Sequence, residues 1–241
     1  MNRVLILAIF LLLAGGCSRK PPSTSAAKPT AFGAAIVESS GGKQIAPAGT
    51  LLPQPVVVQV NDDQGNGVTG AAVEFHGPAG VVFDPPSGIT DSSGQFTTNV
   101  SLGSGGGRYG ITASTYDKSH PRIDLKLQEI ALDYQQVLGQ KLNQHYCERC
   151  HNQESTPERV SNYDNLAVKP HAFTDGDFYN KLSDDDVIAL IAHGGPALNK
   201  SAQMPPYGYT LSNAEMQALL AFIRAVADPP YTKRGLTYAA R

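Results

Sequence analysis

The period of the hydrophobic pattern changes near residue 128, and this change constrains the fold more than any other feature. Before it, over residues 34–128, apolar and polar residues alternate, as in PVVVQVND, where Val56, Val58 and Val60 share one face. A period of two is typical of β-strands with one buried face, whereas residues 129–230 carry apolar residues at helical spacing. Since 241 residues suffice for two domains, we expect an all-β domain followed by an all-α domain.

Further segments of the first part repeat the alternation, namely AAVEFH, QFTTNVSL, RYGITAST and IDLKL. Turn-forming segments separate them: DDQGNG, DPPSG, DSSG and GSGGG. About seven short strands at this spacing predict a β-sandwich. The order of the segments resembles the bacterial immunoglobulin-like domains of invasin and intimin type, over nearly all of residues 34–128. That resemblance implies an immunoglobulin-like sandwich acting as a spacer or a docking module.

The N-terminus has the pattern of an export signal. Arg3 precedes an apolar run over residues 4–13, which is too short to span a membrane and right for a secretory signal. The run ends in LLLAGGCS, which resembles the lipobox of bacterial lipoproteins. The resemblance implies a signal peptide over residues 1–16, and a lipid on Cys17 that anchors the exported chain to a membrane without spanning it. The alternative is an ordinary signal peptide with an incidental cysteine.

Ser18 follows the cysteine where lipoproteins kept at the inner membrane usually have Asp, which favours the outer membrane and a periplasmic or cell-surface location. Residues 17–33 are rich in Pro, Ser, Thr and Ala and predict a flexible linker. Residues 231–241 are predicted to form a basic tail.

The formal net charge of −2 argues against nucleic acid as a partner, because no basic stripe is available to neutralise phosphates.

The segment HYCERCH contains two of the three cysteines, Cys147 and Cys150, with His151 directly after them. At i and i+3 on a helical turn the thiols project from one face, where each can add to a vinyl group of a haem. The histidine can then present its imidazole to the iron. A thioredoxin-like dithiol would need a βαβ context, and a chance occurrence is the other alternative. A four-cysteine zinc site is excluded, because acylation of Cys17 leaves only two thiols.

Residues 129–230 resemble a class I cytochrome c. The resemblance is based on the CxxCH motif, the QMPPYG segment about fifty residues later and a capped final helix. The resemblance implies an all-α fold and one covalently bound haem c. It implies thioethers at Cys147 and Cys150, with His151 and Met204 as the two axial ligands of the iron. It also implies a close crossing of the first and last helices, where Gly139 would meet Phe222.

Two histidines and two tyrosines leave alternatives open. His193 closes a helix, where a cation is favoured by the helix dipole, and His171 is an alternative distal ligand in a loop. Tyr207 and Tyr209 fit either a hydrogen bond to a haem propionate or packing within their loop.

These observations predict an exported, lipid-anchored monohaem cytochrome that transfers single electrons, alone or within an oxidoreductase complex. No acid–base pair or nucleophile motif indicates a small-molecule substrate. Residues 129–230 contain 13 acidic and 7 basic residues, a net charge of −6, so we expect redox partners with a basic patch that dock transiently. The alternatives are a haem-based ligand sensor and an adhesion or scaffold protein whose working part is the sandwich.

Overall fold

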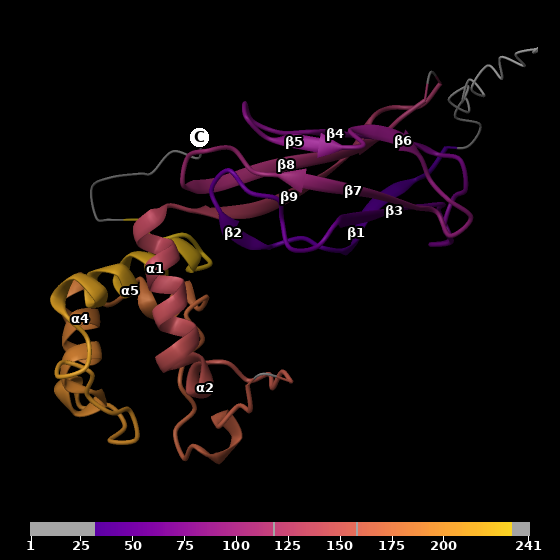
Figure 1. The fold of residues 1–241 in the computed structure, drawn as a ribbon. Coiled ribbons are helices and arrows are strands. Elements are labelled where there is room, and N and C mark those ends of the chain that lie inside the picture. The colour runs from indigo at the N-terminus through magenta and orange to yellow at the C-terminus, as the bar shows by residue number, and fades with distance from the viewer. Residues whose placement is uncertain (1–31, 118, 158, 233–241) are drawn as a thin grey trace, which may run out of the picture.

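The computed structural model describes residues 32–117, 119–157 and 159–232. They form a β-sandwich with a helical domain at one of its ends (Figure 1). The predicted signal peptide, Cys17, most of the predicted linker and most of the predicted basic tail lie outside the described residues. No helix within the described part is both long and apolar enough to cross a membrane.

The sandwich consists of two sheets of mostly antiparallel strands. One sheet has the order β1 (Ala35–Ser40), β3 (Val56–Asn61), β7 (Gln95–Ser101), β5 (Val82–Asp84). The other has the order β2 (Ile45–Pro47), β9 (Ile123–Leu132), β8 (Gly107–Thr115), β4 (Ala72–His76), β6 (Ser87–Ile89). The three-residue strands β2, β5 and β6 are too short to produce an alternating pattern, so the sequence predicted fewer strands than the structure contains.

The alternating residues form the core between the sheets, as predicted. Val56, Val58 and Val60 are fully buried, and Val73 and Phe75 of β4 face them across the sandwich. Burial of each such side chain contributes about 1.5–3 kcal/mol relative to an exposed position. The prediction of an all-β N-terminal domain is therefore confirmed.

The helical domain contains three longer helices and several single turns. Its elements in order are α1 (Tyr134–Leu142), a π-helical segment (Asn143–Cys147), α2 (Glu148–His151), a 3-10 turn (Tyr163–Asn165), α3 (Gly176–Tyr179), α4 (Asp184–His193), a 3-10 turn (Gly195–Leu198) and α5 (Asn213–Val226). Helices α1 and α5 make the main packing contact, at Gly139 of α1, which lies against Ala218 and Phe222 of α5.

The ends of α4 and α5 follow local signals in the sequence. Ser183 and Asp186 form a reciprocal capping box at the start of α4, and Ser212 and Glu215 form the same arrangement at the start of α5. Helix α4 ends at Gly194, which has a φ of 77° that favours glycine. These predicted boundaries are confirmed.

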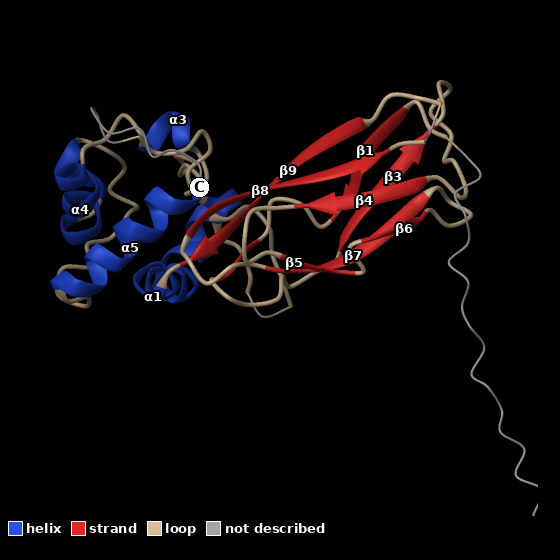
Figure 2. Ribbon diagram, turned by 90° about the horizontal axis from the view of Figure 1, so that it is seen from above, coloured by secondary structure: helices blue, strands red, loops and turns tan. Residues whose placement is uncertain are grey.

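No linker separates the two domains. Strand β9 continues through residue 128 to Leu132, and the next residue, Asp133, is the N-cap of α1. At the other end of β9, Phe32 stacks on His120, with the ring centroids 3.6 Å apart. The chain therefore enters the sandwich at the end opposite the helical domain, as Figure 2 shows from above.

Candidate functional site

A cavity of about 580 Å³ lies inside the helical domain. Apolar side chains from α4 and α5 form much of its wall, and loops close its sides. The predicted site residues Cys147, Cys150, His151 and Met204 all line it. A cavity of this size, mostly apolar with a few polar groups, is typical of a site for a cofactor-sized molecule.

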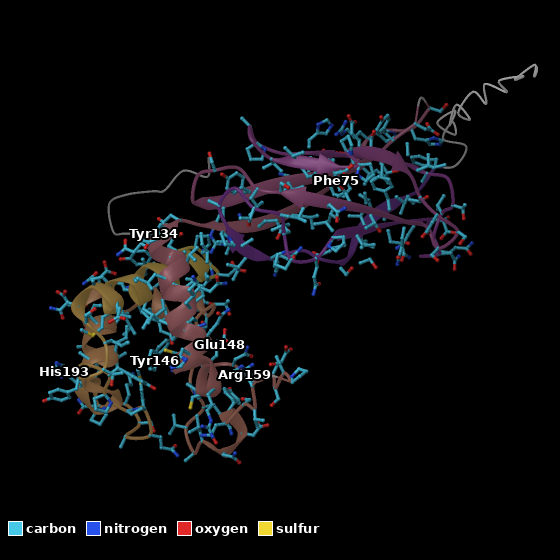
Figure 3. All side chains as sticks on the ribbon, viewed as in Figure 1. Phe75, Tyr134, Tyr146, Glu148, Arg159 and His193 are labelled. Carbon is cyan, nitrogen blue, oxygen red and sulfur yellow. The ribbon has the colours of Figure 1, made fainter. Side chains whose placement is uncertain are left out.

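The two cysteines come from a distorted helical stretch. The π-helical segment ends at Cys147, and α2 carries Cys150 one turn later (Figure 3 labels the neighbouring Tyr146 and Glu148). Both cysteines are free thiols. Burial raises the pKa of Cys147 to about 12, which is the opposite of the lowered pKa that a reactive redox dithiol needs. The cavity thus disfavours a thioredoxin-like role for the pair.

His151 is oriented by a backbone carbonyl. Its Nδ1 lies 2.8 Å from the carbonyl oxygen of His171, so that Nδ1–H donates and Nε2 is left available for a metal. Burial lowers the pKa of His151, which favours the neutral imidazole that binds metals. The ring of Phe173 packs against this imidazole, with centroids 4.7 Å apart.

Met204 lies in a loop that is held against the end of α4. Its carbonyl oxygen accepts a hydrogen bond from the backbone N–H of Gly195 at 3.1 Å. A Cβ on Gly194 would lie 2.5 Å from the same oxygen, so only glycine allows this approach. Pro205 and Pro206 follow and keep the segment out of helical geometry.

The other methionine of the described residues, Met216, has a packing role. Its side chain is 5% exposed, and that of Leu211, just before the N-cap of α5, is 4% exposed. Both belong to the core of the helical domain, as expected of a hydrophobic staple. Met216 does not line the cavity.

The two histidines named as alternatives lie in different surroundings. His171 borders the cavity, but its ring stacks on Phe178 and its Nδ1 lies 2.7 Å from Asp175 Oδ2. Because its carbonyl contacts Nδ1 of His151, this residue lies behind that imidazole, away from Nε2. His193 is exposed on the outer side of α4 (Figure 3).

The two tyrosines of the QMPPYGYT segment differ in their contacts and exposure. The hydroxyl of Tyr207 donates to the carbonyl oxygen of Tyr146, directly before the first motif cysteine, at 3.0 Å. Tyr207 therefore ties the loop that carries Met204 to the segment that carries the cysteines. Tyr209 is fully exposed and does not line the cavity.

Sequence reasoning missed Phe173 and Tyr179, which line the cavity on the side of His151. Tyr179 is buried, and its hydroxyl also donates to the His171 carbonyl, at 3.3 Å. Two cations, Lys169 and Lys200, also line the cavity. These residues follow no helical or strand periodicity in the sequence. The cluster of aromatic residues in HAFTDGDFY could nevertheless have indicated that this segment packs against the core.

The donor set fits a haem better than a bare metal ion. No group of three or more His, Cys, Asp or Glu residues that could hold a metal ion occurs in the described part of the chain. The imidazole of His151 and the thioether of Met204 instead line the cavity together, with two thiols beside that imidazole, which is the set a covalently attached haem requires. The second imidazole in the lining, that of His171, is paired with Asp175.

Comparisons with known proteins agree with this assignment for the helical domain. Residues 135–223 match the protein family described as cytochrome C oxidase, cbb3-type, subunit III. A cytochrome c domain implies haem c and haem-based electron transfer. A search of curated proteins gave no match.

Solved structures similar to this chain include two fragments of intimin and one of invasin. The D00-D0 domain of intimin is 15% identical, with 46% of this chain and 52% of that chain covered and a TM-score of 0.33. The D0-D1 domain of intimin is 18% identical, with 42% and 48% covered and a TM-score of 0.31. Invasin, described as a bacterial integrin-binding protein, is 20% identical, with 40% and 19% covered and a TM-score of 0.31. This chain thus spans about half of the intimin fragments, and these likenesses carry no argument about function.

Proposed function

We propose that the chain is an exported, membrane-anchored monohaem c-type cytochrome that carries single electrons between redox partners. The observation that carries this proposal is that Cys147, Cys150, His151 and Met204 all line the same cavity. When bound, the haem supplies the iron that alternates between the ferric and ferrous states.

The residues of the chain hold the cofactor and set its surroundings. Cys147 and Cys150 would provide the covalent attachment, and His151 and Met204 would be the ligands of the iron. The carbonyl of His171 fixes the imidazole through Nδ1, and the apolar walls from α4 and α5 exclude water. Ligation by His and Met raises the reduction potential relative to bis-His ligation, so we expect a middle- to high-potential carrier.

Covalent attachment can be tested directly. Denaturing gels of the full chain should give a band when stained for haem peroxidase activity, and acidified organic solvent should not extract the colour. A Cys147→Ala, Cys150→Ala double variant should lose the band, whereas His193→Ala, which changes an exposed histidine, should keep it. Extractable haem in the unaltered protein contradicts the proposal.

A haem-based sensor differs from a carrier in its sixth ligand. The Met204 loop lies against Gly194 and Gly195 and borders the same cavity as His151, which favours two protein ligands over an open iron. The optical spectrum of the ferrous protein should therefore change little when carbon monoxide is added. A rapid and complete change favours the sensor.

The position of the sandwich supports a role between anchor and haem domain. The described chain enters the sandwich beside His120, at the far end from α1, so the segment that would carry the anchor joins the sandwich at the end away from the cavity. We propose a periplasmic or cell-surface location at the outer membrane, with partners docking transiently on the helical domain. A scaffold role for the sandwich alone would leave the cavity unexplained.

A further inference from the structure

The two domains share a buried apolar contact. Ile130 and Leu132 of β9 and Phe222 and Val226 of α5 form one buried cluster. Four partly buried side chains pack around it: Ile45, Val137, Phe173 and Ala225. Since β9 leads into α1 without a linker, the helical domain rests directly on the sandwich.

Arg108 of β8 reaches across this contact to the end of α5. Its Nη2 donates to the carbonyl oxygens of Ala225, at 3.1 Å, and Ala227, while Nη1 donates to Oε1 of Gln128 at 2.8 Å. The last carbonyls of a helix lack partners within the helix and carry the negative end of its dipole. Burial lowers the pKa of Arg108, and the nearby carboxylate of Asp228 opposes that shift. The sandwich therefore supplies the C-terminal cap of α5.

The residue after this cap is bonded to the loop beside the cavity. The backbone N–H of Asp228 donates to the carbonyl of Thr174 at 2.8 Å, and its carbonyl accepts from the N–H of Gly176 at 3.0 Å. A Cβ on Gly176 would lie 2.2 Å from the carbonyl oxygen of Pro229, so the two segments are in direct contact. Any movement of residues 227–229 must move residues 174–176.

The same loop orients His151. It contains the carbonyl of His171, which accepts from Nδ1 of His151 at 2.8 Å, and Phe173, whose ring packs on the imidazole. Phe173 also contacts the buried cluster between the domains. One side chain thus touches both the domain contact and the histidine.

From this continuous set of contacts we propose that the β-sandwich positions the axial histidine, with Arg108 as the positioning residue. Arg108 holds the carbonyls at the end of α5, Asp228 transmits their position to the loop of residues 171–176, and that loop fixes the orientation of His151. The inference rests on the proposed function, because it takes His151 as a ligand of the iron. It gives the sandwich a role within the redox domain beyond that of a spacer.

Arg108→Lys in the haem-loaded full chain tests the inference. Lysine keeps the charge but lacks the fork that bridges two carbonyls. We expect the amide protons of Asp228 and Gly176, and the Nδ1 proton of His151 in the ferrous protein, to exchange with solvent at least tenfold faster by NMR. The reduction potential should rise, because a weaker hydrogen bond to Nδ1 makes the imidazole less basic and favours ferrous iron.

Arg122→Lys is the matched control. Arg122 lies on the same domain at the opposite end of β9 and pairs with Asp124 at 3.0 Å and with Glu74 at 3.5 Å. Its replacement should leave the three exchange rates and the potential unchanged. If Arg122→Lys changes them as much as Arg108→Lys does, the effect is a general loss of stability and the inference is wrong.

Two further outcomes separate this inference from the proposed function. Unchanged exchange at Asp228, Gly176 and His151 in a variant that keeps its haem overturns the inference and leaves the cytochrome assignment intact. The inference is also overturned if the two amide protons exchange faster while the exchange rate of the His151 Nδ1 proton and the reduction potential stay unchanged. In that case Arg108 affects the loop but not the orientation of His151. A protein without covalent haem contradicts the proposed function, while amide exchange at Asp228 and Gly176 still reports whether Arg108 fixes the loop.

Discussion

A Cβ placed on Gly139 of α1 would lie 2.0 Å from the carbonyl oxygen of Ala218 of α5. The same Cβ would lie 2.7 Å from the Cβ of Phe222. The two helices therefore touch through their backbones. This crossing brings Phe222 into the contact with the sandwich, while Leu219 and Ile223 of the same helix face the cavity.

Gly139→Ala should force these helices apart. Crowding against a backbone carbonyl outweighs the better helix propensity of alanine, so the free energy of unfolding should fall by about 1–2 kcal/mol. Gly110→Ala is the control, because a Cβ there meets nothing within 4 Å, and it should change stability by less than about 0.5 kcal/mol. Urea unfolding followed by circular dichroism measures both. Equal midpoints for the Gly139 variant and the unaltered protein would contradict the close crossing.

Glu129 of β9 should make the stability of the sandwich depend on pH. The residue is 0% exposed, its Oε1 has no hydrogen-bond partner among the described residues, and Oε2 accepts from the N–H of Gln44. Burial raises its pKa from 4.5 to about 7, and the charge of Glu38 adds to the shift. The folded state then binds the proton more tightly than the unfolded state. Stability should therefore fall by about 2–3 kcal/mol as the pH rises from about 4.5 to 7 and stay level above that.

Glu129→Gln removes the ionisable group and keeps the shape of the protonated acid. The variant should be more stable than the unaltered protein at pH 8 and about equal to it at pH 4.5, as measured by urea unfolding at the two values. Asp63→Asn, which changes an exposed carboxyl, serves as the control and should leave the pH dependence in place. A Gln variant with the same loss of stability between the two pH values would show that another group is responsible.

The parts of the fold that the sequence predicts are those that short-range rules determine. The alternation around Val58 places a strand because burial of one face requires a period of two. Ser183 and Ser212 mark helix starts because their hydroxyls cap N–H groups three residues away. The pair of thiols and the histidine are close in sequence, so their proximity in the cavity follows from a single helical turn.

The parts that the sequence did not predict depend on contacts between distant residues. Arg108 lies on a strand where an exposed arginine would fit equally well, and only the placement of α5 makes it a cap. The hydrogen-bond partner of His151 is a backbone carbonyl. Because every residue has one, the residue types in the sequence cannot indicate which carbonyl it is. Glu129 follows Leu125 and Leu127 on the inward phase of β9, yet a single charged residue in a strand is normally assigned to its exposed face.

Cys17→Ser tests the proposed anchor. Cys17 lies outside the described residues, so the prediction rests on the apolar run and the lipobox-like segment before it. Serine cannot receive a thioether-linked lipid, so the variant should move from the membrane fraction to the soluble exported fraction with its haem still attached. Cell fractionation with haem staining measures both. A variant that stays on membranes after a high-salt wash indicates a different anchor.

The net charge of −6 over residues 129–230 should make electron transfer depend on ionic strength. Opposite charges speed the encounter with a basic partner, and salt screens them beyond about 10 Å at 0.1 M. The bimolecular rate with such a partner should therefore fall steadily from low salt to physiological ionic strength, as measured by stopped-flow absorbance. A rate that rises with salt would indicate an acidic partner that approaches Lys169 and Lys200 at the edge of the cavity.

Met204→Ala tests the assignment of the distal ligand. Met204 lines the cavity, whereas Met216 is buried in the helix core away from it, and these are the two methionines that remain after residue 16. The Met204 variant should lose the near-infrared sulfur-to-iron charge-transfer band of the ferric protein, and its reduction potential should fall, because thioether ligation favours ferrous iron. Met216→Leu should keep both properties and cost at most about 1.5 kcal/mol, since it conserves volume in a packed core. A band that survives in Met204→Ala and disappears in Met216→Leu would assign the ligand to α5, and a band that survives in both would rule out methionine as its source.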